Sequence, residues 1–160
     1  MTMAERIDYL NDPAAPKATS VVPSANVIVV NGQGEILLIR RTDNGNWAVP
    51  GGGMDLGESI TDTAVRETRE ETGITCEITG LVGIYTNPGH VIRYTSNDEV
   101  RQEFSVVFTA RPVRGELRSS SESSEPQWVS PAAIPGLQMH PSMRQRIQHY
   151  LDKRSDPWLG

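Results

Sequence analysis

The sequence lacks several features that would point to particular classes of protein. It contains one cysteine, Cys76, in 160 residues, which excludes an intramolecular disulfide and is typical of a reducing compartment. No apolar run approaches the ~20 residues that a membrane-spanning helix needs. The first residues, MTMAERIDYLNDPAAPK, have neither the basic start nor the apolar stretch of a signal peptide. These absences predict a cytoplasmic protein that does not bind a membrane.

An excess of positive charge is also missing. The 15 Lys and Arg residues are outnumbered by 20 Asp and Glu residues, which gives a net charge of −5. Binding to a nucleic-acid backbone depends on a basic stripe, so the charge argues against a nucleic-acid polymer as partner. A small phosphorylated ligand needs only a few local cations or a metal ion, and that class of partner stays open.

The order of apolar runs and turn residues predicts an α/β (α+β) fold with a single domain, because 160 residues is close to the commonest size of one domain. Strands are expected at residues 25–30, 35–40, 47–50, 74–85, 100–110 and 127–129, with NGQG as a hairpin turn between the first two. Helices are expected at residues 57–72 and 141–153. Residues 91–99 are compatible with a hairpin or a loop, and residues 111–126 with a loop. A mixed sheet covered by helices accounts for this order.

The two ends of the chain differ from this central domain, which we expect at residues 21–154. Residues 1–20, interrupted by Pro13 and Pro16, predict an irregular N-terminal arm. Residues 155–160 form a tail in which Trp158 looks exposed. The tail is expected to dock on the body of the protein or on a second subunit.

The segment RETREETG, residues 66–73, gathers negative charge where a helix tolerates it least. Glu67, Glu70 and Glu71 repel one another at these spacings and face the negative end of the helix dipole. At roughly 100° per residue, Glu67 and Glu71 fall about 20° either side of Ile60 on the apolar face. Inward carboxylates need a proton, an arginine or a divalent cation. A set of oxygen ligands suits Mg²⁺ or Mn²⁺, and an ordinary salt-bridged helix is the alternative.

A glycine-rich stretch, PGGGMDLGES, precedes this helix and adds one more acid, Glu58. Gly51, Gly52 and Gly53 let the backbone approach a ligand closely. Together the loop and helix match a family signature at every fixed position: Gly52, five residues, Glu58, seven residues, then Arg66 to Ile74. The segment therefore resembles the Nudix box, with Thr68 as the one departure, at a site where an aliphatic residue is usual. Threonine is close to valine in volume, so we expect only modest repacking.

The resemblance implies a Nudix-type α/β/α sandwich with a mixed sheet. It also implies hydrolysis of a nucleoside diphosphate linked to a further group X, with a small phosphorylated nucleotide as substrate and Mg²⁺ or Mn²⁺ as cofactor. By this similarity Glu67, Glu70 and Glu71 are the main metal ligands and Glu58 a secondary one. Arg66 would brace the box. The catalytic set is then Glu67, Glu70, Glu71 and Arg66, and a homodimer is consistent with the family and with the apolar tail.

The catalytic base varies across the family, and several acids stay open for that role. Glu70 is one, Glu122 and Glu125 in a loop are others, and Glu103 on a strand is a fourth. Each of these is otherwise a surface acid. Phosphate contacts are expected from Gly51 to Gly53 and from Arg41, the member of the Arg40–Arg41 pair that alternation favours on the site side.

Other residues are assigned simpler roles. Trp47 is expected to pack under the loop, with base stacking as the alternative. Arg93 and Arg101 are further candidates for phosphate contact, and surface charges otherwise. His140 and His149 are expected to be structural. Pro88 in the NPGH turn resembles a feature of the ADP-ribose-cleaving subgroup, which slightly favours ADP-ribose or a nucleotide sugar as substrate. Nucleoside triphosphates, including oxidised ones, are the alternative. A nucleotide-binding sensor without turnover is the alternative outside enzymes.

Overall fold

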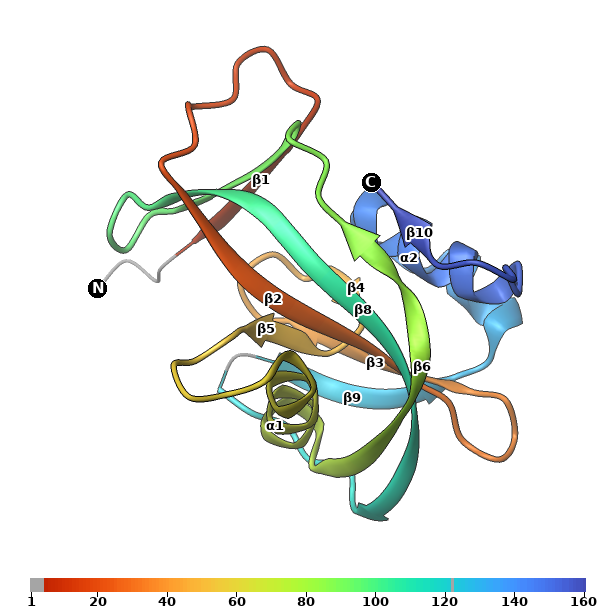
Figure 1. Cartoon of the computed structure of the whole chain (residues 1–160). Coiled ribbons are helices and arrows are strands. Elements are labelled where there is room, and N and C mark those ends of the chain that lie inside the picture. The colour runs from red at the N-terminus through yellow and green to blue at the C-terminus, as the bar shows by residue number, and fades with distance from the viewer. Residues whose placement is uncertain (1–4, 122) are drawn as a thin grey trace.

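The computed structural model describes residues 5–121 and 123–160, and Figure 1 shows two β-sheets with helices packed on them. The larger sheet contains β1 (Arg6–Leu10), β2 (Ser20–Val29), β5 (Gly51–Gly53), β6 (Ile74–Tyr85), β7 (His90–Tyr94), β8 (Val100–Gly115) and β10 (Trp158–Leu159). The smaller sheet contains β3 (Ile36–Arg41), β4 (Trp47–Ala48) and β9 (Ser123–Val129). The helices are α1 (Ile60–Thr72), the 3₁₀ helix η1 (Pro131–Gly136) and α2 (Pro141–Leu151).

The larger sheet is mixed. Its strand order is β1-β7-β8-β2-β5, with β6 paired to β8 and β10 paired to β6. The β2–β8 pair is parallel, whereas β1–β7, β7–β8, β6–β8 and β2–β5 are antiparallel. β5 therefore lies at one end of this order and β1 at the other. Residues from both end strands line a single pocket, which is lined also by β2 and β8.

Both faces of the larger sheet are buried. On β2, Val27 and Val29 belong to an apolar cluster that includes Ala64 of α1. Ile28, which points to the opposite face, belongs to a second cluster that includes Ile147 of α2. Helices thus cover the two faces of a mixed sheet, and the predicted α/β/α sandwich is confirmed.

Helix α1 ends at Thr72 as predicted, but it begins at Ile60 and not at the expected residue 57. The hydroxyl of Ser59 accepts a hydrogen bond from the Asp62 N–H at 3.1 Å, and the Asp62 carboxylate accepts one from the Ser59 N–H at 2.9 Å. This reciprocal pair is a capping box with Asp62 in the third position. Gly73 ends the helix with φ = 83°, in the left-handed region that favours glycine.

Three predictions about local structure were wrong. The N-terminal arm is not irregular throughout, because Arg6–Leu10 forms β1 and pairs with β7. The NGQG turn does not make a regular hairpin: after one bridge, Val30 to Ile36, the flanking strands enter different sheets. The segment expected as a loop at 111–126 contains the end of β8 and the start of β9.

The structure also decides the form of the two segments for which the sequence left alternatives. Residues 90–94 form β7, which makes a hairpin with β8. The tail docks on the body of its own chain, since Trp158 pairs with Gly83 of β6 and its ring lies 4.5 Å from that of His149, centroid to centroid. A side chain at Gly83 would collide with the Trp158 backbone, so the glycine allows this close approach. In the described part of the chain, no helix is both long and apolar enough to cross a bilayer.

Candidate active site

The acidic end of α1 turns inward, as the helical wheel predicts. Glu71 is 7% exposed, and the side chain of Glu67 is 13% exposed. Glu70 differs, because its side chain is 55% exposed. The cluster therefore has two sheltered carboxylates beside the sheet and one that reaches solvent.

The glycines of β5 make room for these carboxylates. A Cβ atom on Gly52 would lie 2.5 Å from the carboxyl carbon of Glu67, so only glycine leaves space for this carboxylate. A Cβ atom on Gly51 would overlap the Ala25 carbonyl oxygen of β2, and the Gly51 N–H lies 3.4 Å from the Glu71 carboxylate. At Gly53, by contrast, the nearest atoms lie at ordinary contact distances of 3.7 and 3.8 Å. Backbone packing thus requires Gly51, whereas Gly52 is needed for the position of the Glu67 carboxylate.

Arg66 holds the loop and the helix together. Its guanidinium donates to both oxygens of Glu58, at 2.6 and 2.9 Å, and to the Gly53 carbonyl oxygen at 3.1 Å. The same group donates to Glu67 at 2.9 Å and to Glu70 at 3.2 Å. Because these donors leave the guanidinium in fixed planar directions, Arg66 fixes three carboxylates and one loop carbonyl at once.

The protonation of the cluster follows from burial and charge. Burial, followed by the charge of Glu67, raises the pKa of Glu71 to about 9. Burial also raises the pKa of Glu67, against the opposing effect of Arg66. The hydrogen bonds from Arg66 lower the pKa of Glu58 to about 2. Without further positive charge, the folded protein therefore keeps Glu71 protonated near neutral pH.

These residues fit a hard divalent cation in donor type. The groove beside α1 gathers three carboxylates and two serine side chains, all with oxygen donors, and the space that Gly52 provides lets Glu67 lie beside the loop. The carboxylates do not converge on one point in the present arrangement. Among the described residues, no three His, Cys, Asp or Glu side chains form a group that could hold a metal ion. Arg66 accounts for this, since it pairs with Glu67 and Glu70 in the present arrangement.

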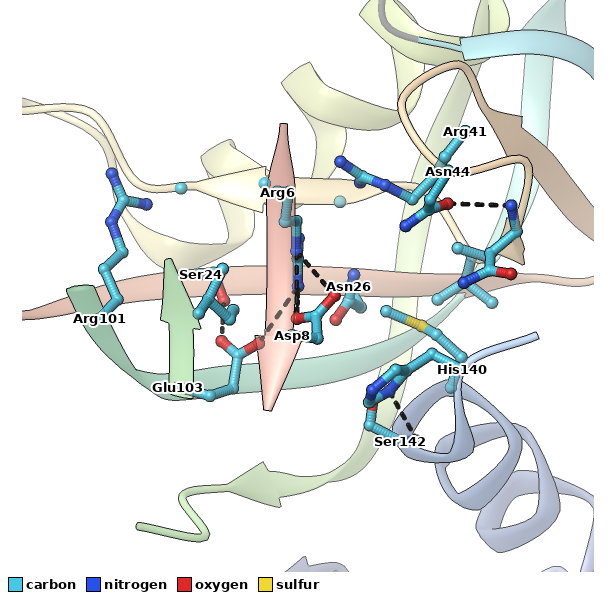
Figure 2. A pocket seen from close by; sticks show the side chains of 18 of the residues that line it. Arg6, Asp8, Ser24, Asn26, Arg41, Asn44, Arg101, Glu103, His140 and Ser142 are labelled. Carbon is cyan, nitrogen blue, oxygen red and sulfur yellow. Dashed lines mark hydrogen bonds and ion pairs between the residues drawn. The ribbon is translucent and has the colours of Figure 1, made fainter. Parts of the chain in front are cut away.

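A pocket opens on the face of β2 opposite α1, and Figure 2 shows it from close by. Ser24 and Asn26 of β2 line it, whereas Ala25 between them faces α1. Because β5 consists of glycines, no side chain at this end of the sheet separates the two faces. Glu71 lines both the pocket and a groove beside α1 that also contains Glu67 and Glu70. The pocket and the acidic groove therefore meet at Glu71.

The residues predicted to contact phosphate or to act as the catalytic base lie in different places. Arg41 lines the pocket and forms a two-point ion pair with Asp43 at 3.0 and 2.7 Å. Glu103 also lines the pocket and is 9% exposed. Glu125 lies 4.0 Å from Arg40 with an exposed side chain. Glu122 lies outside the described residues.

Sequence reasoning missed the pocket residues of β1 and gave other pocket residues different roles. Arg6 and Asp8 reach it from β1 (Figure 2), where Arg6 donates to both Asp8 oxygens at 3.1 to 3.3 Å. Arg101, expected as a phosphate contact or a surface charge, lines the pocket with its guanidinium 4.8 Å from the Tyr94 ring centroid. His140 also lines it and caps α2, because its Nδ1 accepts from the Ser142 N–H at 3.2 Å. The alternation of charged and apolar residues in RIDYL was the one local sign that residues 6–10 form a strand.

The comparisons with known proteins agree with this geometry. The model of the NUDIX domain matches residues 21–150. A Bacillus subtilis (strain 168) protein with the provisional name 8-oxo-dGTP diphosphatase is 32% identical, over 82% of this chain and 81% of its own length. The ADP-ribose pyrophosphatase of Methanocaldococcus jannaschii is 32% identical, over 68% of this chain and 62% of its own.

Among solved structures, a NUDIX hydrolase from Nitrosomonas europaea superposes with a TM-score of 0.71 at 22% identity, covering 90% of this chain and 80% of the other. This likeness supports the fold alone. The family match covers most of the chain and includes the whole loop and helix that carry Gly52, Glu58 and the acidic cluster. The chain therefore belongs to the Nudix hydrolase family.

Proposed function

We propose that this protein uses a divalent cation to hydrolyse the phosphoanhydride bond of a nucleoside diphosphate linked to a further group X. The observation that carries the proposal is the shared position of Glu71, which lines both the acidic groove and the pocket. A phosphate chain that enters the pocket would reach the carboxylates across the glycine strand. The family uses divalent cations such as Mg²⁺ or Mn²⁺, and the carboxylate donors here suit either ion.

Each box residue is assigned a role that follows from its surroundings. Glu67, Glu70 and Glu71 are the proposed ligands, and Glu58 acts mainly by holding Arg66 in place. A bound cation would neutralise phosphate oxygens and lower the pKa of a bound water. Since Arg66 already pairs with Glu67 and Glu70, a small rotation of these side chains would exchange arginine contacts for metal contacts.

Two further groups serve the phosphate chain. The backbone of Gly51 to Gly53 offers close approach because it carries no side chains. Arg41 lines the same pocket, and its guanidinium is suited to phosphate oxygens. We assign both to phosphate binding.

Glu70 is the proposed catalytic base. It is the most exposed carboxylate of the cluster, so a water molecule can reach it, and it lies in the groove with Glu67 and Glu71. Glu125 is less suited, because its carboxylate lies beside Arg40 instead. Glu103 lies between two guanidinium groups, at 4.0 Å from Arg6 and 3.9 Å from Arg146, which favours a binding role.

The identity of X has two candidates. ADP-ribose or a nucleotide sugar is supported by the name of the Methanocaldococcus relative. A nucleoside triphosphate is supported by the name of the Bacillus relative, whose alignment covers more of both chains. Pro88 contributes little, since it lines a surface hollow with Trp158 and Gly160 and is absent from the residues that line the main pocket.

Product analysis with Mg²⁺ tests the proposal and separates the candidates. A nucleotide sugar or ADP-ribose would yield two monophosphates, whereas a triphosphate would yield a nucleoside monophosphate and pyrophosphate. Binding of nucleotides with Mg²⁺ present, but with no product from any of them over hours, would refute the enzyme and favour a sensor.

A further inference from the structure

The end of the pocket formed by β1 and β8 carries an unusual pair of charged groups. Glu103 of β8 and Arg6 of β1 face each other there, with Glu103 Oε2 4.0 Å from Arg6 Nη2 (Figure 2). β1 lies outside the part of the chain that the family model matches, residues 21–150. Its contribution to the pocket is therefore a feature of this chain that the family match does not explain.

The hydrogen bonds of this pair are incomplete. Glu103 Oε1 accepts from the Ser24 hydroxyl at 3.2 Å. Within the described residues nothing donates to Oε2, which has only the guanidiniums of Arg6 and Arg146 nearby, at 4.0 and 3.9 Å. Arg6 uses Nε and Nη2 to hold Asp8, so its Nη1 has no acceptor in the part of the chain that the structure describes. A sheltered carboxylate oxygen without a donor is costly unless a ligand or water binds it.

The pair is held rigidly from behind. Asp8, which orients Arg6, lies 3.3 Å from His90 Nε2. Arg146 is 1% exposed, donates to the Asn26 side chain, and has its guanidinium 5.0 Å from the Tyr85 ring centroid. Since neither Arg6 nor Glu103 is free to swing into solvent, the acceptor and the donor keep their relative positions when a ligand enters.

We propose that Glu103 and Arg6 read the edge of a guanine base, which makes guanine nucleotides the preferred substrates. Guanine presents two adjacent N–H donors, N1–H and the N2 amino group, next to the O6 acceptor. The carboxylate of Glu103 accepts from the two donors, because Oε2 is open and Oε1 keeps a second lone pair. Arg6 donates to O6. Adenine offers a single amino donor beside one acceptor on this edge and leaves the carboxylate less satisfied.

The inference rests on the proposed function and identifies the nucleobase of the substrate. With the guanine at Glu103, the phosphate chain extends along the pocket toward Gly51 to Gly53 and Glu71, which line its other end. Glu103 and Arg6 are specificity residues in this arrangement and touch no reacting atom. Their loss should therefore raise KM for guanine nucleotides and leave kcat nearly unchanged.

A panel of four substrates, GTP, ATP, GDP-mannose and ADP-ribose, distinguishes a preference for the nucleobase from a preference for the group X. In the wild-type protein we expect kcat/KM for the guanine member of each pair to exceed that of the adenine member by about ten-fold or more. In Glu103→Gln the ratio should fall toward one through KM, with kcat for GTP within about two-fold of wild type. Arg6→Lys, which keeps the cation beside Asp8 but not the planar fork, should lower the same ratio.

The matched control is Glu77→Gln, an exposed carboxylate on β6 that pairs with Arg111, and it should change neither ratio nor KM. Equal use of guanine and adenine by the wild-type protein, or a preference for adenine, would overturn the inference. A loss of kcat on all four substrates in Glu103→Gln, with the melting temperature unchanged, would also overturn it. That result would indicate that Glu103 takes part in the chemical step.

Binding of GMP and AMP without Mg²⁺, measured by calorimetry, keeps the two proposals distinct. If no nucleotide is hydrolysed but GMP binds tightly and loses about ten-fold in affinity in Glu103→Gln, the proposed function fails and the base assignment holds. If hydrolysis is normal and GMP binds no better than AMP, the base assignment fails and the proposed function holds.

Discussion

Three adjacent glycines in β5 should respond to the same substitution in three different ways. Replacing each by alanine adds one methyl group, and the surroundings of that methyl decide the outcome. At Gly52 the new Cβ would lie 2.5 Å from the carboxyl carbon and Oε1 of Glu67. The carboxylate must then retreat by about 1 Å, and a misplacement of that size can cost about 100-fold in rate. Because the displaced atoms end a side chain, the fold should change little in stability.

The other two glycines supply the controls. At Gly51 the methyl would overlap the Ala25 carbonyl oxygen and lie 2.9 Å from the Asn26 Cα, both backbone atoms. Overpacking of this kind costs roughly 1–3 kcal/mol, or about 2 to 12 °C in melting temperature for a chain of this size. At Gly53 the nearest atoms are 3.7 and 3.8 Å away, so Gly53→Ala should be neutral or slightly stabilising.

The assay is kcat/KM with Mg²⁺ beside a melting curve for each variant. The expected order is a large loss of activity with normal melting for Gly52→Ala, lower melting for Gly51→Ala, and normal melting with the smallest loss of activity for Gly53→Ala. Full activity in Gly52→Ala would refute the idea that this glycine makes room for a working Glu67. Equal inactivation of Gly52→Ala and Gly53→Ala would refute the steric argument as a whole.

Three further predictions concern α1 and its loop. Because the pKa of Glu71 is raised to about 9 in the folded protein, the unfolded chain loses this proton first, and the free energy of unfolding without metal should fall as pH rises from about 5 to 9. Urea titrations of wild type and Glu71→Gln across this pH range test this. Equal slopes of unfolding free energy against pH in the two proteins would contradict it. Mg²⁺ should stabilise the fold by about 2.7 kcal/mol at 100 times its Kd, whereas a melting temperature unchanged by Mg²⁺, with and without a nucleotide, would count against the cation site. Ser59→Ala should cost about 1 kcal/mol through the lost cap, and unchanged melting would argue that the capping box contributes nothing.

The parts of the site that the sequence predicted are those encoded locally. Glu67, Glu70 and Glu71 lie within five residues on one helix, so a helical wheel is enough to orient them, and both ends of α1 follow from Ser59 and Gly73. The glycine loop is also local, although the wheel says nothing about why Gly52 is needed. That reason depends on how closely α1 packs against β5.

The parts that the sequence did not predict depend on distant pairings. β1 lies beside β7, where Arg6 pairs with Tyr94 across more than eighty residues of sequence, and no turn signal connects them. The NGQG turn was recognised, but a turn does not specify that its two strands enter different sheets. Glu103 could be predicted only as one of several candidate bases, because its neighbours Arg6 of β1 and Arg146 of α2 arrive from opposite ends of the chain.

The central claim is that the inward carboxylates of α1 work on a phosphate chain held in the adjoining pocket. The most direct test is the turnover of Glu71→Gln and Glu70→Gln with saturating Mg²⁺ and a substrate that the wild-type protein cleaves. Both should lose about 10³-fold or more in kcat while keeping the fold and nucleotide binding. Turnover near the wild-type rate in both variants would contradict the account.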